Sequence, residues 1–330
     1  MNGEPRAVEA DGLVKRFGTL EAVAGVSFSV ERGEVFAFLG PNGAGKSTTI
    51  NMLCTLVSPT SGEARVAGYD VVTQRDQVRR HIGLVFQDVT LDGYLTAEQN
   101  LRLHAELYGV PRSVIDARMR LVLDMVGLWD RRKSKVNDYS GGMKRRLEIA
   151  RGLLHSPRVL FLDEPTVGLD PQTRSSIWSY IRQLRASEGT TIFMTTHYMD
   201  EAEYCDRIAI MDQGQIVALD TPEALKESVG EDRVQIDTDD DERAVRELAD
   251  KFGVDARVVE GLLTFSVKQG EEFVPRLFAE LDVTIRSVNV ARPTLDDVFM
   301  RYTGTTIRDA EASGSDRLRS NPMVQVRRGR

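Results

Sequence analysis

The stretch Gly40-Pro41-Asn42-Gly43-Ala44-Gly45-Lys46-Ser47 decides the fold, because it matches the phosphate-binding pattern G-x-x-x-x-G-K-[ST]. A candidate buried strand, residues 35–39 (VFAFL), precedes it, and a helical pattern, residues 47–56 (STTINMLCTL), follows. Glycines let backbone N–H groups point at a phosphate chain, and the helix start adds a favourable partial charge. A plain glycine-rich turn is the alternative, but strand, loop and helix occur in the order that phosphate binding requires. The stretch therefore predicts a nucleotide site, in which Lys46 reaches the β- and γ-phosphates, Ser47 ligates Mg²⁺ and Thr48 adds a further contact.

A second stretch, residues 159–164 (VLFLDE), ends an apolar run in two acids. Such a run is typical of a strand buried on both faces of a sheet, with its carboxyl end beside the phosphate loop. We expect Asp163 to hold Mg²⁺ and Glu164 to polarise the attacking water. An acidic strand end that faces solvent is the alternative, and the phosphate loop upstream makes it the weaker interpretation.

Alternating strand and helix patterns predict an α/β domain over residues 7–228, with a helical insertion at about residues 94–155. Outside that insertion, residues 1–93 read as strands separated by turns, apart from the helix after the glycine-rich loop. Residues 231–303 give the order β-α-β-β-α-β, which is that of a ferredoxin-like split βαβ unit. Residues 304–330 lack an apolar pattern and are expected to form a disordered tail.

Composition excludes several classes of protein. With 43 Lys and Arg against 50 Asp and Glu, the formal net charge is −7, which argues against a nucleic-acid partner. No apolar run approaches the roughly 18–20 residues that span a bilayer, and the first residues lack the apolar core of a secretory signal. We therefore expect a cytoplasmic protein whose membrane role, if any, comes through a partner.

The stretch Ser140-Gly141-Gly142-Met143-Lys144-Arg145-Arg146, some 20 residues before the acidic strand, resembles the signature motif of the ABC ATPases. In that family, the serine and glycines bind the γ-phosphate of ATP held by the opposite subunit. The resemblance implies a homodimer with ATP at its interface, and it adds Met143 to the ATP contacts. An ordinary N-cap followed by a basic amphipathic helix is the alternative.

Four further landmarks follow the family order, and the resemblance covers about residues 7–225. Gln87 resembles the Q-loop glutamine, which senses Mg²⁺ and water and faces the membrane partner. Gly168-Leu169-Asp170 resembles the D-loop, which contacts the other subunit. His197 resembles the switch histidine at the γ-phosphate, and Phe17 the aromatic residue that stacks on adenine. The implied catalytic residues are Lys46, Glu164 and His197, and the implied Mg²⁺ ligands are Ser47, Gln87 and Asp163.

Some positions depart from the commonest family pattern, namely Phe17, Tyr139, Met143 and Val167-Gly168. The variant SGGMKRR, together with the C-terminal PTLDDVFMRYTG, resembles the daunorubicin/doxorubicin-resistance group of drug exporters. The implied fold is an ABC-type P-loop NTPase domain with a helical insertion, followed by an α+β ferredoxin-like domain. The implied function is Mg²⁺-dependent ATP hydrolysis for an exporter. Its integral membrane permease would be a separate chain, and this subunit would lie on the cytoplasmic face of the membrane.

Two other functions stay open on these residues. A non-transport ABC ATPase acting on nucleic acid or ribosomes has the same motifs, but it usually carries coiled-coil arms or two tandem cassettes, and this sequence shows neither. A regulatory module that binds ATP but hydrolyses it poorly is disfavoured by the presence of Glu164 and His197.

Overall fold

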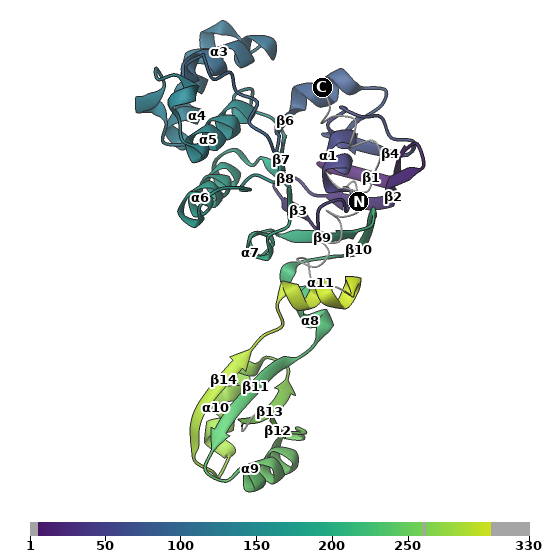
Figure 1. Cartoon of the computed structure of the whole chain (residues 1–330), viewed down its shortest axis with the longest axis vertical. Helices are drawn as coiled ribbons and strands as arrows, with labels where there is room; N and C mark the ends of the chain where they lie inside the picture. Colours follow the sequence, from purple (N-terminus) through teal and green to yellow (C-terminus); the bar gives the residue numbers. More distant parts are fainter. Residues whose placement is uncertain (1–5, 260–261, 305–330) are drawn as a thin grey trace, which may run out of the picture. The chain divides into compact units, whose positions relative to one another are not determined.

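Six strands form the main sheet of the first of two compact units, in the order β10-β9-β3-β8-β7-β6 (Figure 1). The computed structural model describes residues 6–259 and 262–304. The first unit ends at Leu219, and the second begins at Asp220. The predicted disordered tail lies, from residue 305 onward, outside the described residues. The strands of this sheet are β3 (Val35–Leu39), β6 (Ile82–Val85), β7 (Val159–Asp163), β8 (Thr191–Thr196), β9 (Arg207–Asp212) and β10 (Gln215–Asp220).

The register of this sheet brings three strand ends to one edge. Strands β3, β7 and β8 are buried along their whole length, as their apolar runs predict. They pair in parallel, with Leu39 opposite Thr196 and Asp163 opposite Thr195. The segments that follow β3, β7 and β8 therefore leave the sheet at the same edge.

A second, smaller sheet shares a core with the first. Its strands lie in the order β2-β1-β4-β5 and pair antiparallel. Phe28 of this sheet packs against Phe36, Phe38 and Phe193 of the main sheet, with ring centroids 5.1–5.8 Å apart. The strands are β1 (Val8–Phe17), β2 (Leu20–Val30), β4 (Ser61–Val66) and β5 (Tyr69–Asp70).

Helices flank these sheets, and three of them form the predicted helical insertion. In that insertion, Thr96 and Gln99 form a capping box at the start of α3, and buried apolar residues at helical spacing hold the three helices together. Among the described residues, no helix is both long and apolar enough to cross a bilayer. The helices of the insertion are α3 (Ala97–Leu107), α4 (Arg112–Met125) and α5 (Gly141–Leu153), and those outside it are α1 (Lys46–Leu53), α2 (Arg75–His81), α6 (Pro171–Glu188) and α7 (Met199–Ala202).

The expectation of strands and turns for the rest of residues 1–93 is wrong at helix α2. This helix has seven residues, and Val78 is its one buried side chain. A helix with a single buried position shows no apolar periodicity, and periodicity is the main sequence signal for a helix.

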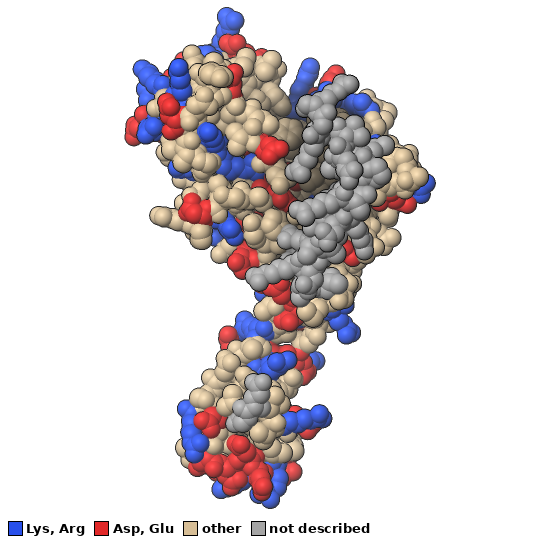
Figure 2. Space-filling view, viewed as in Figure 1, with Lys and Arg blue, Asp and Glu red and all other residues tan. Residues whose placement is uncertain are grey.

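The second unit confirms the ferredoxin-like prediction. Its sheet has the order β14-β11-β13-β12, with every neighbouring pair antiparallel, and its apolar face packs under α9 and α10. Figure 2 shows acidic side chains gathered around the start of α9, where the sequence has the acidic run 239–242. The elements are α8 (Pro222–Val229), β11 (Asp232–Thr238), α9 (Asp241–Glu247), β12 (Arg257–Val259), β13 (Leu262–Val267), α10 (Gly270–Glu280), β14 (Ile285–Ala291) and α11 (Leu295–Thr303).

Helix α8 lies in the second unit, where it packs against α11. The hydroxyl groups of Ser228 and Tyr302 are 3.3 Å apart across this pair. The boundary expected from sequence, between residues 228 and 231, leaves α8 with the first domain. Its partner helix lies some 70 residues later in the sequence, and a local pattern does not show such a contact.

Candidate functional site

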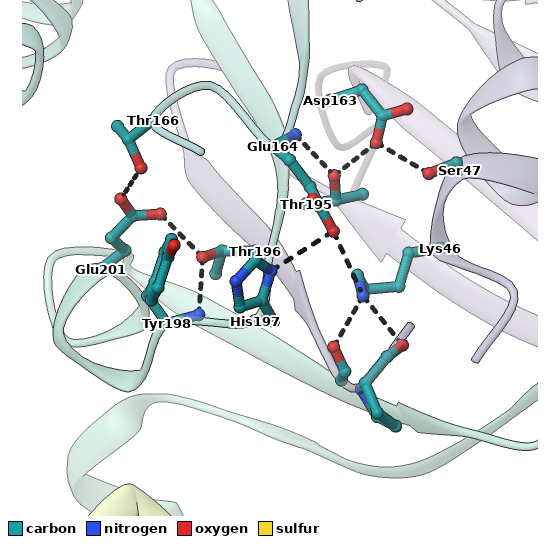
Figure 3. Close-up of polar contacts among 12 residues, drawn as sticks. Lys46, Ser47, Asp163, Glu164, Thr166, Thr195, Thr196, His197, Tyr198 and Glu201 are labelled. Atoms are coloured by element: carbon teal, nitrogen blue, oxygen red, sulfur yellow. Dashed lines mark hydrogen bonds and ion pairs between the residues drawn. The ribbon is translucent and has the colours of Figure 1, made fainter. Parts of the chain in front are cut away.

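At the carboxyl edge of the main sheet lie the side chains of the phosphate loop, of the acidic strand end and of the histidine after β8 (Figure 3). Lys46 and Ser47 are the first residues of α1, directly after the glycine-rich loop. Asp163 is the last residue of β7 and is followed by Glu164, and His197 follows β8. The parallel register explains their convergence, because each of these segments begins where a buried strand ends.

Two glycines of the loop are required by close backbone approach. A Cβ at Gly45, whose φ is +102°, would lie 2.6 Å from the Ala22 carbonyl oxygen. A Cβ at Gly40 would lie 2.3 Å from the Met211 carbonyl oxygen. A side chain at either position would displace the loop from its supporting strands.

Lys46 is buried, and its ammonium group has several oxygen partners. Its Nζ donates to the carbonyl oxygens of Gly40 (2.6 Å) and Pro41 (3.0 Å) and lies 3.7 Å from Glu164 Oε1. A buried ammonium is stable only with such partners. The charge is thereby held inside the curve of the loop, where a phosphate chain would meet it.

Asp163, at the end of β7, links α1 to the neighbouring strand β8. Its Oδ1 accepts hydrogen bonds from Ser47 Oγ (3.0 Å) and from Thr195 Oγ1 (2.6 Å). The side chains of Ser47 and Asp163, both expected from sequence to ligate Mg²⁺, therefore lie in direct contact. Hydroxyl and carboxylate oxygens are the donors that Mg²⁺ prefers, so this pair fits the ion.

Glu164 is buried between two basic side chains. Its Oε1 lies 3.7 Å from Lys46 Nζ and 3.5 Å from His197 Nδ1. Burial by itself raises the pKa of Glu164, but the adjacent His197 and Lys46 more than offset this, so the pKa lies below its ordinary value. The carboxylate is therefore ionised at neutral pH and can accept a hydrogen bond from a water molecule.

Each of the two units of the chain matches a known protein family. Residues 23–167 match the ABC transporter family, and residues 221–303 match the C-terminal domain of DrrA1-3-like ATP-binding proteins. The linearmycin resistance ATP-binding protein LnrL of Bacillus subtilis is 39% identical over 311 residues, which cover 92% of this chain and 100% of that one. This chain belongs to the ABC transporter ATP-binding proteins. It is an ATP-hydrolysing subunit of an ABC transporter.

Other relatives of this ABC ATPase agree with that assignment. The daunorubicin/doxorubicin resistance ATP-binding protein DrrA of Streptomyces peucetius is 40% identical, over 92% of this chain and 94% of that one. Among solved structures, CbiO1 of Clostridium perfringens, part of the transporter complex cbiONQ, matches with a TM-score of 0.63 and 30% identity, over 68% of this chain and 94% of that one. A dimeric cassette bound to ADP and Pi, MJ0796, matches with a TM-score of 0.59 and 29% identity, over 65% and 98%.

Several residues that the ABC resemblance implies lie outside the cluster around Lys46. Ser140 caps α5 by accepting a hydrogen bond from the Met143 N–H (3.2 Å), and both Ser140 and Gly141 are exposed. Asp170 caps α6 by accepting from the Thr173 N–H (3.0 Å). The hydrogen-bond and ion-pair partners given above for Lys46, Ser47, Asp163 and Glu164 do not include Ser140, Gly141 or Gly142.

The Q-loop glutamine and the adenine-stacking aromatic residue are also exposed. Gln87 follows β6 with its side chain in solvent, and it takes no part in the Ser47–Asp163 contact. Phe17 is 50% exposed, and Lys15 Nζ lies 4.9 Å from its ring centroid. An exposed ring beside a cation is open to stacking by a nucleotide base.

Sequence reasoning missed two polar side chains that support the site. Thr195 Oγ1 accepts a hydrogen bond from the Glu164 N–H (2.9 Å) while it donates to Asp163. Glu201 on α7 is buried and accepts hydrogen bonds from Thr166 and Thr196, the residue before His197 (Figure 3). The signal for Thr195 was its place two residues before His197 on a buried strand. Glu201 gave no signal, because a glutamate in a helix is normally exposed.

Proposed function

We propose that this ABC ATPase powers the export of a hydrophobic drug or antibiotic through a separate integral membrane permease. The names of its relatives support the substrate class, since they include linearmycin and daunorubicin/doxorubicin resistance proteins. In this proposal the chain lies at the cytoplasmic face of the membrane and hydrolyses ATP as a homodimer. The first unit, which ends at Leu219, carries the ATPase function, and the second unit, which begins at Asp220 and includes α8, is an accessory domain.

The contacts at the sheet edge suggest a role for each site residue. Lys46 neutralises the β- and γ-phosphates, and Ser47 and Asp163, with Gln87, hold Mg²⁺, which offsets phosphate charge when bound. Glu164 accepts a hydrogen bond from a water molecule and orients its oxygen towards the γ-phosphorus. As the water oxygen bonds to phosphorus, the bond to the ADP oxygen breaks, and the proton that the water shared with Glu164 passes to that carboxylate. His197 stabilises the charge on the γ-phosphate oxygens.

The exposure of the signature motif carries the dimer proposal. Ser140 and Gly141 present a hydroxyl group and a helix N-terminus to solvent, although both features suit an anionic phosphate. The hydrogen bonds and the ion pair of Lys46, Ser47 and Asp163 are with other residues of the same chain. In this proposal a second copy therefore supplies the ATP that Ser140 and Gly141 bind. Each site is then completed by two chains, and hydrolysis removes the contact that joins them.

The permease docking surface is proposed to include residues 87–95, beside the helical insertion. Val89 and Tyr94 in this segment are 48% and 81% exposed. Thr90, in the same segment, lines a cavity of about 320 Å³ together with Leu84, Phe86 and Tyr108 among others. An exposed apolar surface beside a cavity suits the apolar side of a short helix from a membrane subunit.

Co-expression with its permease tests the transporter proposal. We expect the ABC ATPase to sediment with membranes when a polytopic partner is co-produced and to stay in the supernatant without it. Cells that hold both chains should accumulate less of an exported drug than cells with Lys46→Ala in place of the wild-type chain. Sedimentation with ribosomes or nucleic acid, irrespective of the permease, would favour the non-transport alternative.

Substitution of Gly141 tests the shared site. A Cβ at Gly141 meets no atom within 4 Å, and an acidic residue in the first turn of α5 is favourable for the monomer. We expect Gly141→Asp to keep the wild-type unfolding temperature but to weaken ATP-dependent dimerisation by about 10-fold or more, since a carboxylate would face the second copy's γ-phosphate. Light scattering with Mg-ATP measures the dimer.

The neutral variant Gly141→Asn is the matched control for this charge. Asparagine has the size of aspartate but no charge. It should therefore weaken the dimer less than Gly141→Asp does, because it does not repel the second copy's γ-phosphate. Equal dimerisation of the wild-type protein and Gly141→Asp would contradict the proposed position of the signature motif.

A further inference from the structure

Arg145, in the second turn of α5, binds the backbone at the end of β7. Its side chain is buried, at 5% exposed. Nη2 donates to the carbonyl oxygens of Asp163 (3.0 Å) and Glu164 (3.2 Å), and Nε donates to that of Pro165 (2.6 Å). One guanidinium group thus holds three consecutive peptide groups. Two of them are the peptide groups before and after Glu164.

The same guanidinium also binds the segment after β6. Nη1 donates to the carbonyl oxygen of Phe86, the residue before Gln87, and lies 3.2 Å from Glu148 Oε2. Glu148 is fully buried, and its Oε1 accepts from the N–H (2.7 Å) and the hydroxyl group (3.1 Å) of Thr90. The buried pair Arg145–Glu148 therefore joins residues 86–90 to the residue proposed to orient the attacking water.

Glu164 needs such support because of its backbone conformation. Its φ is +46°, in the left-handed region that a residue with a Cβ adopts only when its surroundings hold it there. The Thr195 hydroxyl group accepts from its N–H, and Arg145 donates to its carbonyl oxygen. With both peptide groups held, the carboxylate is aimed at Lys46 and His197.

We propose that Arg145 is a positioning residue for ATP hydrolysis, which holds Glu164 in its left-handed conformation and, with Glu148, makes that conformation respond to residues 86–90. The second part rests on the proposed function, in which the permease docks on this segment. A displacement of Phe86 or Thr90 by the permease changes the hydrogen bonds of Arg145 and Glu148. The position of the Glu164 carbonyl, and with it that of the carboxylate, then changes as well.

Arg145→Lys tests the positioning role. A lysine has one ammonium group in place of a planar fork, so it cannot serve three carbonyl groups, Phe86 and Glu148 together. We expect kcat for ATP hydrolysis to fall by about 10-fold or more. The Kd for Mg-ATP should stay within about twofold of wild type, because Arg145 contacts Asp163 only at its backbone carbonyl oxygen, while the Asp163 side chain is held by Ser47 and Thr195.

Arg118→Lys is the matched control. Arg118 also donates to backbone carbonyl oxygens, those of Leu153 (3.0 Å) and Leu154 (3.3 Å), but these lie at the end of α5 and not on β7. Its kcat should stay within about twofold of wild type. An equal loss of kcat in both variants would overturn the proposal in favour of a general structural role.

A double-mutant cycle with Glu164→Gln separates positioning from general support. Because Arg145 acts through Glu164, adding Arg145→Lys to Glu164→Gln should lower kcat no further. If the fold decrease in kcat of the double variant equals the product of the decreases in the two single variants, the proposal is overturned. If Arg145→Lys does not fold, the neutral pair Arg145→Gln/Glu148→Gln replaces it in the same cycle, with the same expected results.

The proposed response of Glu164 to permease docking is tested with Glu148→Gln in the reconstituted complex of ATPase and permease. We expect the ratio of permease-stimulated to basal ATPase rate to fall by about threefold or more, because Thr90 loses its charged partner. A wild-type ratio in this variant would overturn the link to residues 86–90. If the wild-type protein itself shows no stimulation, the proposed function fails, while the cycle with Glu164→Gln still decides the role of Arg145.

Discussion

Lys46→Ala is expected to weaken Mg-ATP binding by about 100-fold, or about 3 kcal/mol, and to reduce hydrolysis to background. The ammonium group is held by the carbonyl oxygens of Gly40 and Pro41 at the base of the phosphate loop, 3.7 Å from Glu164. Alanine removes the main counter-charge for the β- and γ-phosphates and leaves the buried Glu164 carboxylate without one of its two basic neighbours. Titration with a fluorescent ATP analogue and release of inorganic phosphate measure the two effects.

The control for this variant is Lys133→Ala, which removes an exposed lysine outside the site. It should bind and hydrolyse ATP as the wild-type protein does. Wild-type affinity and turnover in Lys46→Ala would show that the triphosphate does not lie in the glycine-rich loop.

Glu164→Gln is expected to bind Mg-ATP with wild-type affinity but to turn over about 100- to 10,000-fold more slowly. The pKa of Glu164 lies below its ordinary value of 4.5, despite the opposing effect of burial, because of the nearby His197 and Lys46, so the wild-type residue is a carboxylate at neutral pH. Glutamine keeps its size and position yet offers the water a neutral, weaker acceptor. Phosphate release under saturating ATP gives the rate.

This variant should also accumulate as a dimer, because ATP remains in the shared sites. Size-exclusion chromatography with Mg-ATP should show mostly dimer for Glu164→Gln and a monomer–dimer mixture for the wild-type protein. Asp200→Asn, an exposed acid on α7, is the control for loss of one negative charge. Wild-type turnover in Glu164→Gln would remove this residue from its proposed role.

The sequence was sufficient to predict the sheet edge because its signals are local. A buried strand before the glycine-rich loop and another before Asp163 each place a polar segment at a strand end. Parallel pairing then brings these ends together, and the structure shows Asp163 opposite Thr195 and in contact with Ser47. The βαββαβ order was likewise visible, because each of its elements has its own apolar pattern.

The supports of the site could not be predicted in the same way. Apart from Glu148, the hydrogen-bond partners of Arg145 lie 18 to 59 positions away in the sequence. Its place in a basic run predicts a solvent-exposed face. Glu201 reaches Thr166 across 35 positions. Buried charged side chains are rare, so a sequence pattern assigns them to the surface until tertiary contacts are known. Helix α2 was missed for a related reason, since one buried valine gives no period.

A crystal structure of Glu164→Gln with Mg-ATP tests the central claim most directly. The account predicts a dimer in which each triphosphate lies against Lys46, Ser47 and Asp163 of one copy and against Ser140 and Gly141 of the other. A nucleotide held by one copy alone, or a γ-phosphate remote from Asp163, would contradict it.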